Sequence, residues 1–206
     1  MRDRTPTATI RAVVTAVAAT AALLVGGCGS DPAPISRDAD AQSQLAAPVA
    51  ATSTDPSSPA RLTAAGGSAS IDPVATDTAG ALLPPQDVAR LGWWVDSSLP
   101  GSGSGVIVIT GHVDDVDQGR GFAARFTRLN TGDAVTLTAA DGHRHDYRVS
   151  RTALTDKQGA GSSGLPVREL NRQDGPETLA LVTCGGPFVG PPLGYRDNVV
   201  VFAVPA

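Results

Sequence analysis

The sequence predicts an all-β protein whose strands close into a barrel. Five or six segments have the apolar runs or the polar–apolar alternation of strands, whereas helical patterns are confined to two short stretches, 122–129 and 167–170. Turn signals rich in Gly and Pro separate the strands at short intervals. Closely spaced strands with little helix favour a closed or nearly closed β-barrel with long loops over alternating βαβ units.

The chain of 206 residues starts with an export segment. Three arginines within the first eleven residues precede an uncharged run over 12–25, which is followed by Val25-Gly26-Gly27-Cys28. This order is typical of a signal peptide, and the run is shorter than the ~20 residues of a membrane-spanning helix. The segment resembles a bacterial lipobox, so we predict lipidation of Cys28, with an uncleaved signal anchor as the alternative. Both alternatives assign residues 1–28 to export and membrane attachment, and both place the rest of the protein outside the cytoplasm.

Residues 29–78 are predicted to be a disordered tether. They are dominated by Ala, Ser, Thr, Pro, Asp and Gly and contain no aromatic residue, so they bury too little apolar surface to offset the entropy of ordering. Residues 79–206 remain for one compact domain with a sizeable core. The formal net charge is −4 and the arginines are scattered, which gives no support to nucleic acid as a partner.

Within 79–206, strands are predicted, in chain order, over 106–110, 134–138, 143–150, 179–183 and 198–204. The first is the clearest, because all five of its residues are β-branched. Asp141-Gly142 is predicted to join the second and third strands through a type I′ turn. Loops rich in Gly and Pro are predicted over 100–105, 157–174 and 187–194, and the long middle one is expected to be a binding loop.

A reactive pair is predicted where two strands end. Cys184 follows the strand 179–183 and precedes two glycines that leave room for a substrate, while His112 stands just past the strand 106–110. If these strands run parallel, both side chains emerge at the same rim of the barrel. Since Cys28 belongs to the anchor, Cys184 is alone in an oxidising compartment, where a single thiol is either buried and inert or retained for its reactivity.

These residue types suit nucleophilic chemistry. A thiolate is a nucleophile that a neighbouring imidazolium or guanidinium stabilises. His112 is suited to protonate a leaving amine, and Arg196 to hold an oxyanion or a carbonyl through two hydrogen bonds. Arg120 and Arg125 are further candidates for the arginine's role. The alternative is a buried Cys184 that acts as a small hydrophobic residue.

Three motifs in this order resemble those of sortases, and most closely the actinobacterial class F. They are Thr110-Gly111-His112-Val113-Asp114, Leu181-Val182-Thr183-Cys184-Gly185-Gly186 and Tyr195-Arg196-Asp197-Asn198-Val199-Val200-Val201. The resemblance covers roughly residues 83–204. It implies a closed eight-stranded β-barrel and a cysteine transpeptidase, in which Cys184 is the nucleophile, His112 the general acid and Arg196 the residue that holds the substrate carbonyl or oxyanion.

By the same resemblance, the substrate is a sorting signal such as Leu-Pro-x-Thr-Gly on a secreted protein. The signal is cut after Thr, and an amine on a cell-wall precursor or pilin, or water, resolves the acyl-enzyme. We expect a monomer anchored at the outer face of the membrane of an actinobacterium-like Gram-positive cell, although sortases usually carry a transmembrane anchor. Two alternatives stay open: a thiol peptidase that only hydrolyses, and a non-catalytic β-barrel binding module on a tether.

Three further residues are predicted to contact the substrate: Thr183, Asn198 and Trp94. Asn198 shares a strand face with Arg196, because residues two apart on a strand point the same way. Trp94 belongs to the only tryptophan pair, for which core packing and the lining of a substrate groove are the two alternatives.

Two groups of residues offer possible metal ligands, and in both cases a solvated surface is preferred. His143 and His145 share a strand face and would need His112 to bind zinc, but they lie beside a hairpin turn. A second group, Asp114, Asp115 and Asp117, offers carboxylates to Ca²⁺, but the residues that follow lack the other ligands of an EF-hand. No cofactor is predicted.

Overall fold

The computed structural model describes residues 45–206. Cys28, the predicted anchor over 1–28 and the first part of the predicted tether lie outside these residues. Between residues 45 and 206, no helix has both the length and the apolar character needed to cross a membrane.

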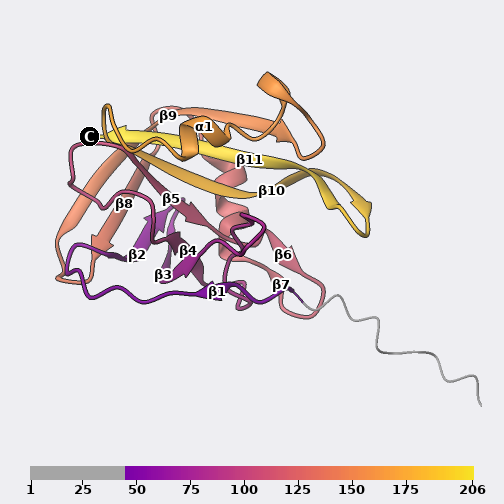
Figure 1. The fold of residues 1–206 in the computed structure, drawn as a ribbon, viewed down its shortest axis with the longest axis horizontal. Helices are drawn as coiled ribbons and strands as arrows, with labels where there is room; N and C mark the ends of the chain where they lie inside the picture. Colours follow the sequence, from indigo (N-terminus) through magenta and orange to yellow (C-terminus); the bar gives the residue numbers. More distant parts are fainter. Residues whose placement is uncertain (1–44) are drawn as a thin grey trace, which may run out of the picture. The chain divides into compact units, whose positions relative to one another are not determined.

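A closed eight-stranded β-barrel forms the body of the molecule (Figure 1). The strand order is β3-β2-β8-β9-β11-β10-β5-β4, pairing between β3 and β4 closes the ring, and β1 pairs with β3. The barrel strands and β1 are β1 (Val49–Ala50), β2 (Pro59–Ala64), β3 (Gly67–Ala75), β4 (Leu91–Trp94), β5 (Val106–Thr110), β8 (Ala134–Ala139), β9 (Arg144–Asp156), β10 (Thr178–Gly190) and β11 (Gly194–Pro205). The smaller elements are β6 (Asp114–Asp115), β7 (Gly119–Arg120), the 3₁₀ helices η1 (Phe122–Arg128) and η2 (Gly161–Ser163), and the helix α1 (Val167–Leu170). The predicted all-β barrel is confirmed.

Three strands lie where a disordered tether was predicted. β1, β2 and β3 fall within residues 49–75, and β2 and β3 are part of the ring, so the prediction for 29–78 is wrong for this stretch. The composition was misleading because these strands bury only a few apolar side chains, none of them aromatic, and most of these are separated by polar residues. The buried apolar residues are Leu62, Ala64, Ala69, Ile71 and Val74. The period of two between buried and exposed positions, rather than a high content of large apolar residues, marks such a strand.

The β8–β9 hairpin turns differently from the prediction. In residues 45–206, Ala65 is the one non-glycine residue with a positive φ, so Asp141 does not adopt the conformation that a type I′ turn requires. Gly142 instead takes a φ of 87°, and its N–H donates to the Ala139 carbonyl at 3.0 Å. The Asp141 carboxylate accepts a hydrogen bond from the His143 N–H at 2.9 Å, which a short acidic side chain makes readily in such turns. β9 then continues past the predicted end at 150, to Asp156.

The strands β5, β10 and β11 are buried on both faces. One face contributes Ile107, Leu181 and Val201 to the barrel interior, and the other contributes Val108 and Phe202 to a second cluster outside it. Leu170 of α1 completes that outer cluster. Continuous apolar strands are expected wherever a sheet is covered on both sides. Part of this outer face, including Val108, Leu170 and Val182, borders a groove.

Candidate active site

Cys184 and His112 emerge at the same rim of the barrel. β5 and β10 run parallel, and Thr110 beside Val182 is the last pair of their ladder; β5 ends there, whereas β10 continues past Cys184 to Gly190. The Gly111 N–H donates to the Val182 carbonyl at 3.2 Å, and the Thr183 hydroxyl donates to the Gly111 carbonyl at 2.9 Å. The two strands are parallel, so the condition for a shared rim is met. The predicted strand end before Cys184 is wrong, because pairing with β11 extends β10 to Gly190. Thr183 links the end of β5 to β10.

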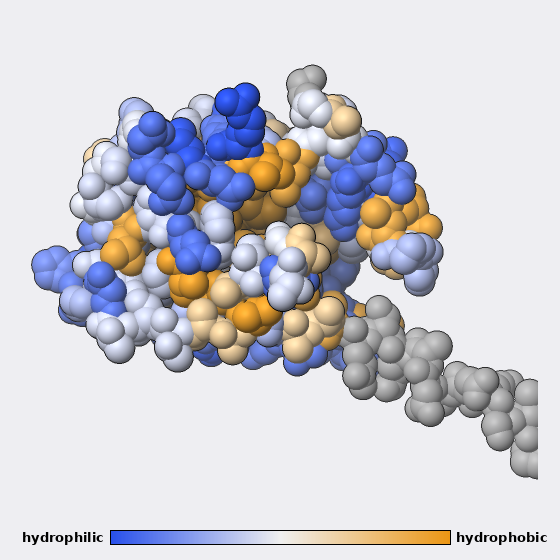
Figure 2. Space-filling view, in the orientation of Figure 1, coloured by the Kyte–Doolittle hydropathy of each residue, from blue (hydrophilic) through white to orange (hydrophobic). Residues whose placement is uncertain are grey.

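A groove of about 440 Å³ leads away from this rim, and both Cys184 and His112 line it. Its floor and walls are largely apolar and include Leu82, Trp94, Val108, Leu165, Leu170 and Val182. Figure 2 shows apolar surface gathered beside α1. Trp94 therefore lines the groove, whereas its neighbour Trp93 is buried in the barrel core. Asn198 also lines the groove and lies directly opposite Cys184 in the β10–β11 ladder.

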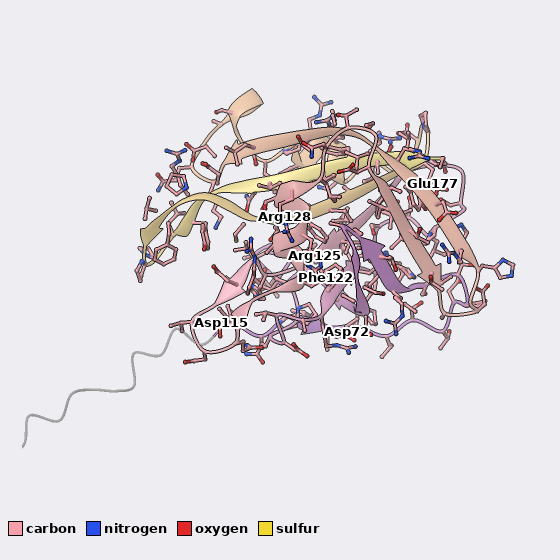
Figure 3. All side chains as sticks on the ribbon, turned by 180° about the vertical axis from the view of Figure 1, so that it is seen from behind. Asp72, Asp115, Phe122, Arg125, Arg128 and Glu177 are labelled. Carbon is pink, nitrogen blue, oxygen red and sulfur yellow. The ribbon has the colours of Figure 1, made fainter. Side chains whose placement is uncertain are left out.

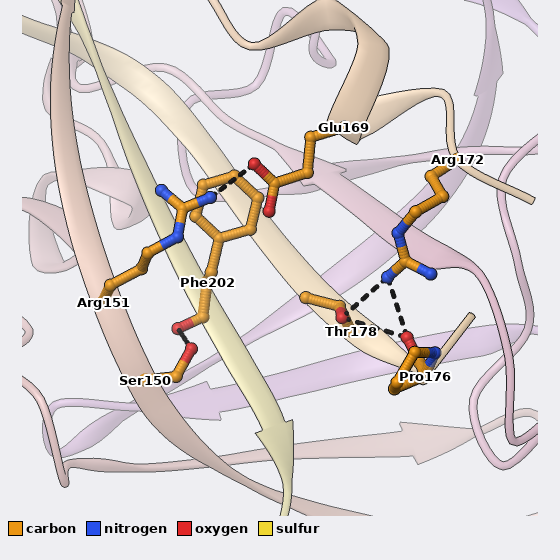
Figure 4. Close-up of polar contacts among 7 residues, drawn as sticks. All are labelled: Ser150, Arg151, Glu169, Arg172, Pro176, Thr178 and Phe202. Carbon is orange, nitrogen blue, oxygen red and sulfur yellow. Dashed lines mark hydrogen bonds and ion pairs between the residues drawn. The ribbon is translucent and has the colours of Figure 1, made fainter. Parts of the chain in front are cut away.

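The segment that carries α1 forms one wall of the groove. Side-chain contacts to neighbouring strands hold this segment in place (Figure 4). Glu169 of α1 accepts a hydrogen bond from Arg151 of β9 at 2.5 Å, and the same guanidinium lies 3.7 Å from the centroid of the Phe202 ring. Further along, Arg172 donates to the Pro176 carbonyl at 2.8 Å and to the Thr178 hydroxyl at 3.0 Å. A helix of one turn has little stability of its own, so these contacts keep the wall in place.

His112 is half-buried, and its Nε2 finds no hydrogen-bond partner within residues 45–206. Burial lowers the pKa of its imidazole below the ordinary 6.5, while the nearby carboxylates of Asp115 and Asp114 act in the opposite direction. The neutral form is therefore favoured. An imidazole that is neutral at pH 7 but lies beside a thiol suits proton transfer in either direction.

The thiol of Cys184 is free, half-buried and next to a cation that the sequence analysis missed. Lys157 Nζ lies 3.4 Å from Cys184 Sγ and donates to the Leu193 carbonyl at 3.3 Å. Lys157 directly follows β9, and its backbone N–H donates to the Arg196 carbonyl across the β9–β11 ladder at 3.1 Å. Residues 151–156 have no polar–apolar alternation, so no local pattern indicated that β9 continues and brings Lys157 to this rim.

Arg196 does not join Cys184 and His112 in the groove. Its guanidinium is half-exposed and donates to both carboxylate oxygens of Asp197, from Nε at 2.9 Å and from Nη2 at 3.0 Å. This pair lowers the pKa of the Asp197 carboxyl and raises that of the Arg196 guanidinium. The buried carboxylate lies against Gly186, where a Cβ atom would clash with it. Arg120 and Arg125 line a different hollow.

A second hollow, of about 230 Å³, opens on the other side of the reactive pair. It shares only His112, Lys157 and Cys184 with the groove. Asp114 and Tyr195 lie on its wall, and the Tyr195 hydroxyl donates to Asp114 Oδ2 at 2.5 Å. This hydrogen bond raises the pKa of Tyr195 and ties the loop after His112 to the β10–β11 hairpin. The reactive pair is thus open to two separate hollows.

Neither group of possible metal ligands is assembled into a site. Within residues 45–206, no group of three or more His, Cys, Asp and Glu side chains is arranged to hold a metal ion. The position of a Cβ on Gly101 lies against the His145 ring, and His143 is exposed. Asp115 accepts hydrogen bonds from the backbone N–H groups of Asp117 and Gln118, and Asp114 accepts one from Tyr195.

A closed barrel whose free cysteine and histidine, on two neighbouring parallel strands, line one groove defines a class of β-barrel proteins equipped for thiol chemistry. The model of the sortase domain family matches residues 68–206, and the chain belongs to the sortase family. A search of curated proteins found no match.

Solved structures of sortases have the same fold. Sortase C-1 from Actinomyces oris is 19% identical over 71% of this chain and 72% of that chain, with a TM-score of 0.53. Sortase C1 from Streptococcus agalactiae is 18% identical over 75% and 70%, with a TM-score of 0.54. Sortase A from Corynebacterium diphtheriae is 18% identical over 72% and 60%, with a TM-score of 0.52.

Proposed function

We propose that this protein is a cysteine transpeptidase that cleaves a Leu-Pro-x-Thr-Gly-like sorting signal and transfers the acyl group to an amine in the envelope of a Gram-positive bacterium. One observation carries the proposal: the free thiol of Cys184 and the imidazole of His112 line the same largely apolar groove. The groove offers room for the apolar residues of a sorting signal, and the second hollow offers a separate approach for the amine.

In the proposed mechanism, the Cys184 thiolate attacks the Thr carbonyl carbon. A C–S bond forms, the C–N bond to Gly breaks, and the imidazolium of His112 gives its proton to the leaving amine. The acceptor amine then attacks the thioester carbon and loses a proton to His112, and the C–S bond breaks to restore the thiolate. Because burial lowers the pKa of His112, the imidazolium that starts the cycle is a minority form at neutral pH.

In this proposal, two cations stabilise two different negative charges. Lys157 contacts the sulfur and stabilises the thiolate. Arg196 is proposed to hold the substrate carbonyl or oxyanion, and to do so its guanidinium must exchange Asp197 for the substrate. Asn198, Thr183 and Trp94 are proposed to shape the groove around the sorting signal.

We further propose that the enzyme resembles class F sortases, acts as a monomer and is held at the outer face of the membrane through its first 28 residues. Lipidation of Cys28 and an uncleaved signal anchor remain the two alternatives for that attachment. Intact mass of the membrane-extracted protein distinguishes them, because lipidation adds acyl mass to a chain that begins at Cys28.

The decisive experiment is intact-mass spectrometry of the full-length protein incubated with a Leu-Pro-x-Thr-Gly peptide library. We expect an acyl adduct on Cys184 that is absent from Cys184→Ala. Addition of a peptide with a free N-terminal glycine then separates the alternatives: a ligated product indicates transpeptidation, and only hydrolysed peptide indicates a thiol peptidase. No adduct, together with a Cys184 that iodoacetamide does not modify in the folded protein, contradicts the proposal and favours a binding module.

A further inference from the structure

A hollow of about 350 Å³ on the other face of the molecule is lined by three arginines. Figure 3 shows Phe122, Arg125 and Arg128 together on η1, and Arg120 of β7 is the third arginine of the lining. None of the residues that line this hollow borders the groove or the second hollow beside Cys184. We propose that this hollow, the arginine pocket, binds a phosphate group. This inference does not depend on the transpeptidase activity.

Packing, rather than an ion pair, positions the central arginine of the pocket. The Arg125 guanidinium lies 5.3 Å from the centroid of the Phe122 ring, which gives a cation–π contact. On another side it lies against the β2–β3 turn, where even a Cβ atom on Gly67 would clash with it. Arg125 Nε is buried and has no hydrogen-bond partner within residues 45–206. The glycine at position 67 therefore makes room for this guanidinium.

The arginines of the pocket have no acidic partners in the described part of the chain. Elsewhere in residues 45–206, Arg90, Arg144, Arg151 and Arg196 each pair with a carboxylate. Arg120, Arg125 and Arg128 take no part in those pairs, and no carboxylate lines their pocket.

One carboxylate, that of Asp114, belongs to the residue opposite Arg120 in the β6–β7 ladder. Its Oδ2 accepts the hydrogen bond from Tyr195 instead. Three positive charges that share a hollow repel one another, and a bound anion offsets this repulsion because it is attracted to all three.

A phosphate group fits this arrangement better than a carboxylate. Guanidinium groups bind phosphate oxygens through paired, charge-assisted hydrogen bonds. A phosphate monoester carries a charge of about −1.5 to −2 at pH 7, so it balances more of the three positive charges than a single carboxylate does. The volume of the pocket leaves room for a group attached to the phosphate. Free phosphate and the headgroup of an anionic lipid are the two sources of this chemistry.

Titration calorimetry on the full-length protein tests the proposal with two soluble probes: inorganic phosphate, and glycerol 3-phosphate, the monoester headgroup of phosphatidic acid. We expect Arg125→Gln and Arg128→Gln each to weaken binding about tenfold, which corresponds to the loss of ~1.4 kcal/mol. The matched control is Arg144→Gln, which removes the same charge from the β8–β9 hairpin, outside the pocket, and should bind like wild type. Tighter binding of one probe identifies the source.

The proposal is overturned if neither probe binds, or if Arg144→Gln weakens binding as much as the pocket variants do. Arg128→Gln keeps the test valid if Arg125→Gln does not fold. Arg128 is exposed, and it is the guanidinium of Arg125, not that of Arg128, that packs against Gly67. Unchanged binding by a folded Arg128→Gln together with an unfolded Arg125→Gln also counts against the proposal.

Discussion

The Lys157 ammonium lies 3.4 Å from the Cys184 sulfur, whereas the Arg196 guanidinium pairs with Asp197. The cation in contact with the nucleophile is therefore the one that follows β9, and not the one predicted on β11. An ammonium at this distance stabilises a thiolate, so the two cations make separable contributions that substitution can distinguish.

Substitution of Lys157 tests the first contribution. We expect Lys157→Met to slow alkylation of Cys184 at pH 7 by about five- to tenfold, because two unit charges ~4 Å apart interact by about 1 kcal/mol even in water. Lys157→Arg should restore part of the rate. Iodoacetamide labelling followed by mass spectrometry measures both. Equal rates for wild type and Lys157→Met would show that the contact does not affect the thiol.

Substitution of the reactive pair should abolish acyl transfer without unfolding the barrel. We expect Cys184→Ala to form no acyl adduct, and His112→Gln to lower the rate of adduct formation by roughly 10²- to 10⁴-fold, the usual contribution of a general acid. Thermal unfolding followed by circular dichroism should show transitions close to that of wild type. Either variant with wild-type turnover would refute the assigned roles.

The lowered pKa of His112 makes stability depend on pH. The unfolded chain binds a proton on this histidine near pH 6.5, while the folded protein binds it only at lower pH. The free energy of unfolding should therefore have its full His112 contribution above pH 6.5 and lose it as the pH falls toward the folded pKa.

Urea unfolding at pH 7.5 and pH 5 measures this loss. His112→Gln should lose less stability than wild type over the same interval, since the two proteins differ only at this residue. An identical loss in the two proteins would contradict the assignment.

The Arg151–Glu169 contact should affect substrate binding more than chemistry. Glu169→Gln weakens the attachment of α1, which forms a wall of the groove, so we expect KM to rise about two- to fivefold with little change in kcat. The effect on stability should stay within about 0.2–1 kcal/mol, as for other exposed ion pairs. Asp146→Asn removes an exposed ion pair at the β8–β9 hairpin and should leave KM unchanged. A change in kcat alone would argue against a role in binding.

The N-terminal strands should be required for folding. A chain restricted to residues 79–206 lacks β2 and β3. β4 then loses its pairing with β3, β8 loses its pairing with β2, and the ring is open between them. We expect such a chain to show no cooperative thermal transition, whereas residues 45–206 should unfold cooperatively. Circular dichroism of the two purified fragments gives the comparison. A cooperative transition for 79–206 would mean that the barrel closes without these strands.

Local sequence patterns predicted the parts of the site that depend on single strands. The β-branched run correctly placed His112 just past the end of β5. The apolar run correctly predicted a strand before Cys184, but that strand continues past Cys184 to Gly190, because β10 pairs with β11 there. β2 and β3 were not predicted because they bury only a few apolar residues, none of them aromatic, which leaves the composition of the segment close to that of a polar linker. Lys157 was missed because the pairing of β9 with β11, a contact distant in sequence, determines where β9 ends. The Arg196–Asp197 pair depends on side-chain rotamers, which composition does not reveal.

The groove and the second hollow meet only at His112, Lys157 and Cys184. Under the proposed mechanism, the groove would select the acyl donor and the second hollow would select the acceptor amine. Donor and acceptor preference would then be independent traits that can be evolved or engineered one at a time. Exchanging residues in the β10–β11 hairpin would redirect the product without altering which proteins are cut, and changing the lining beneath α1 would do the reverse.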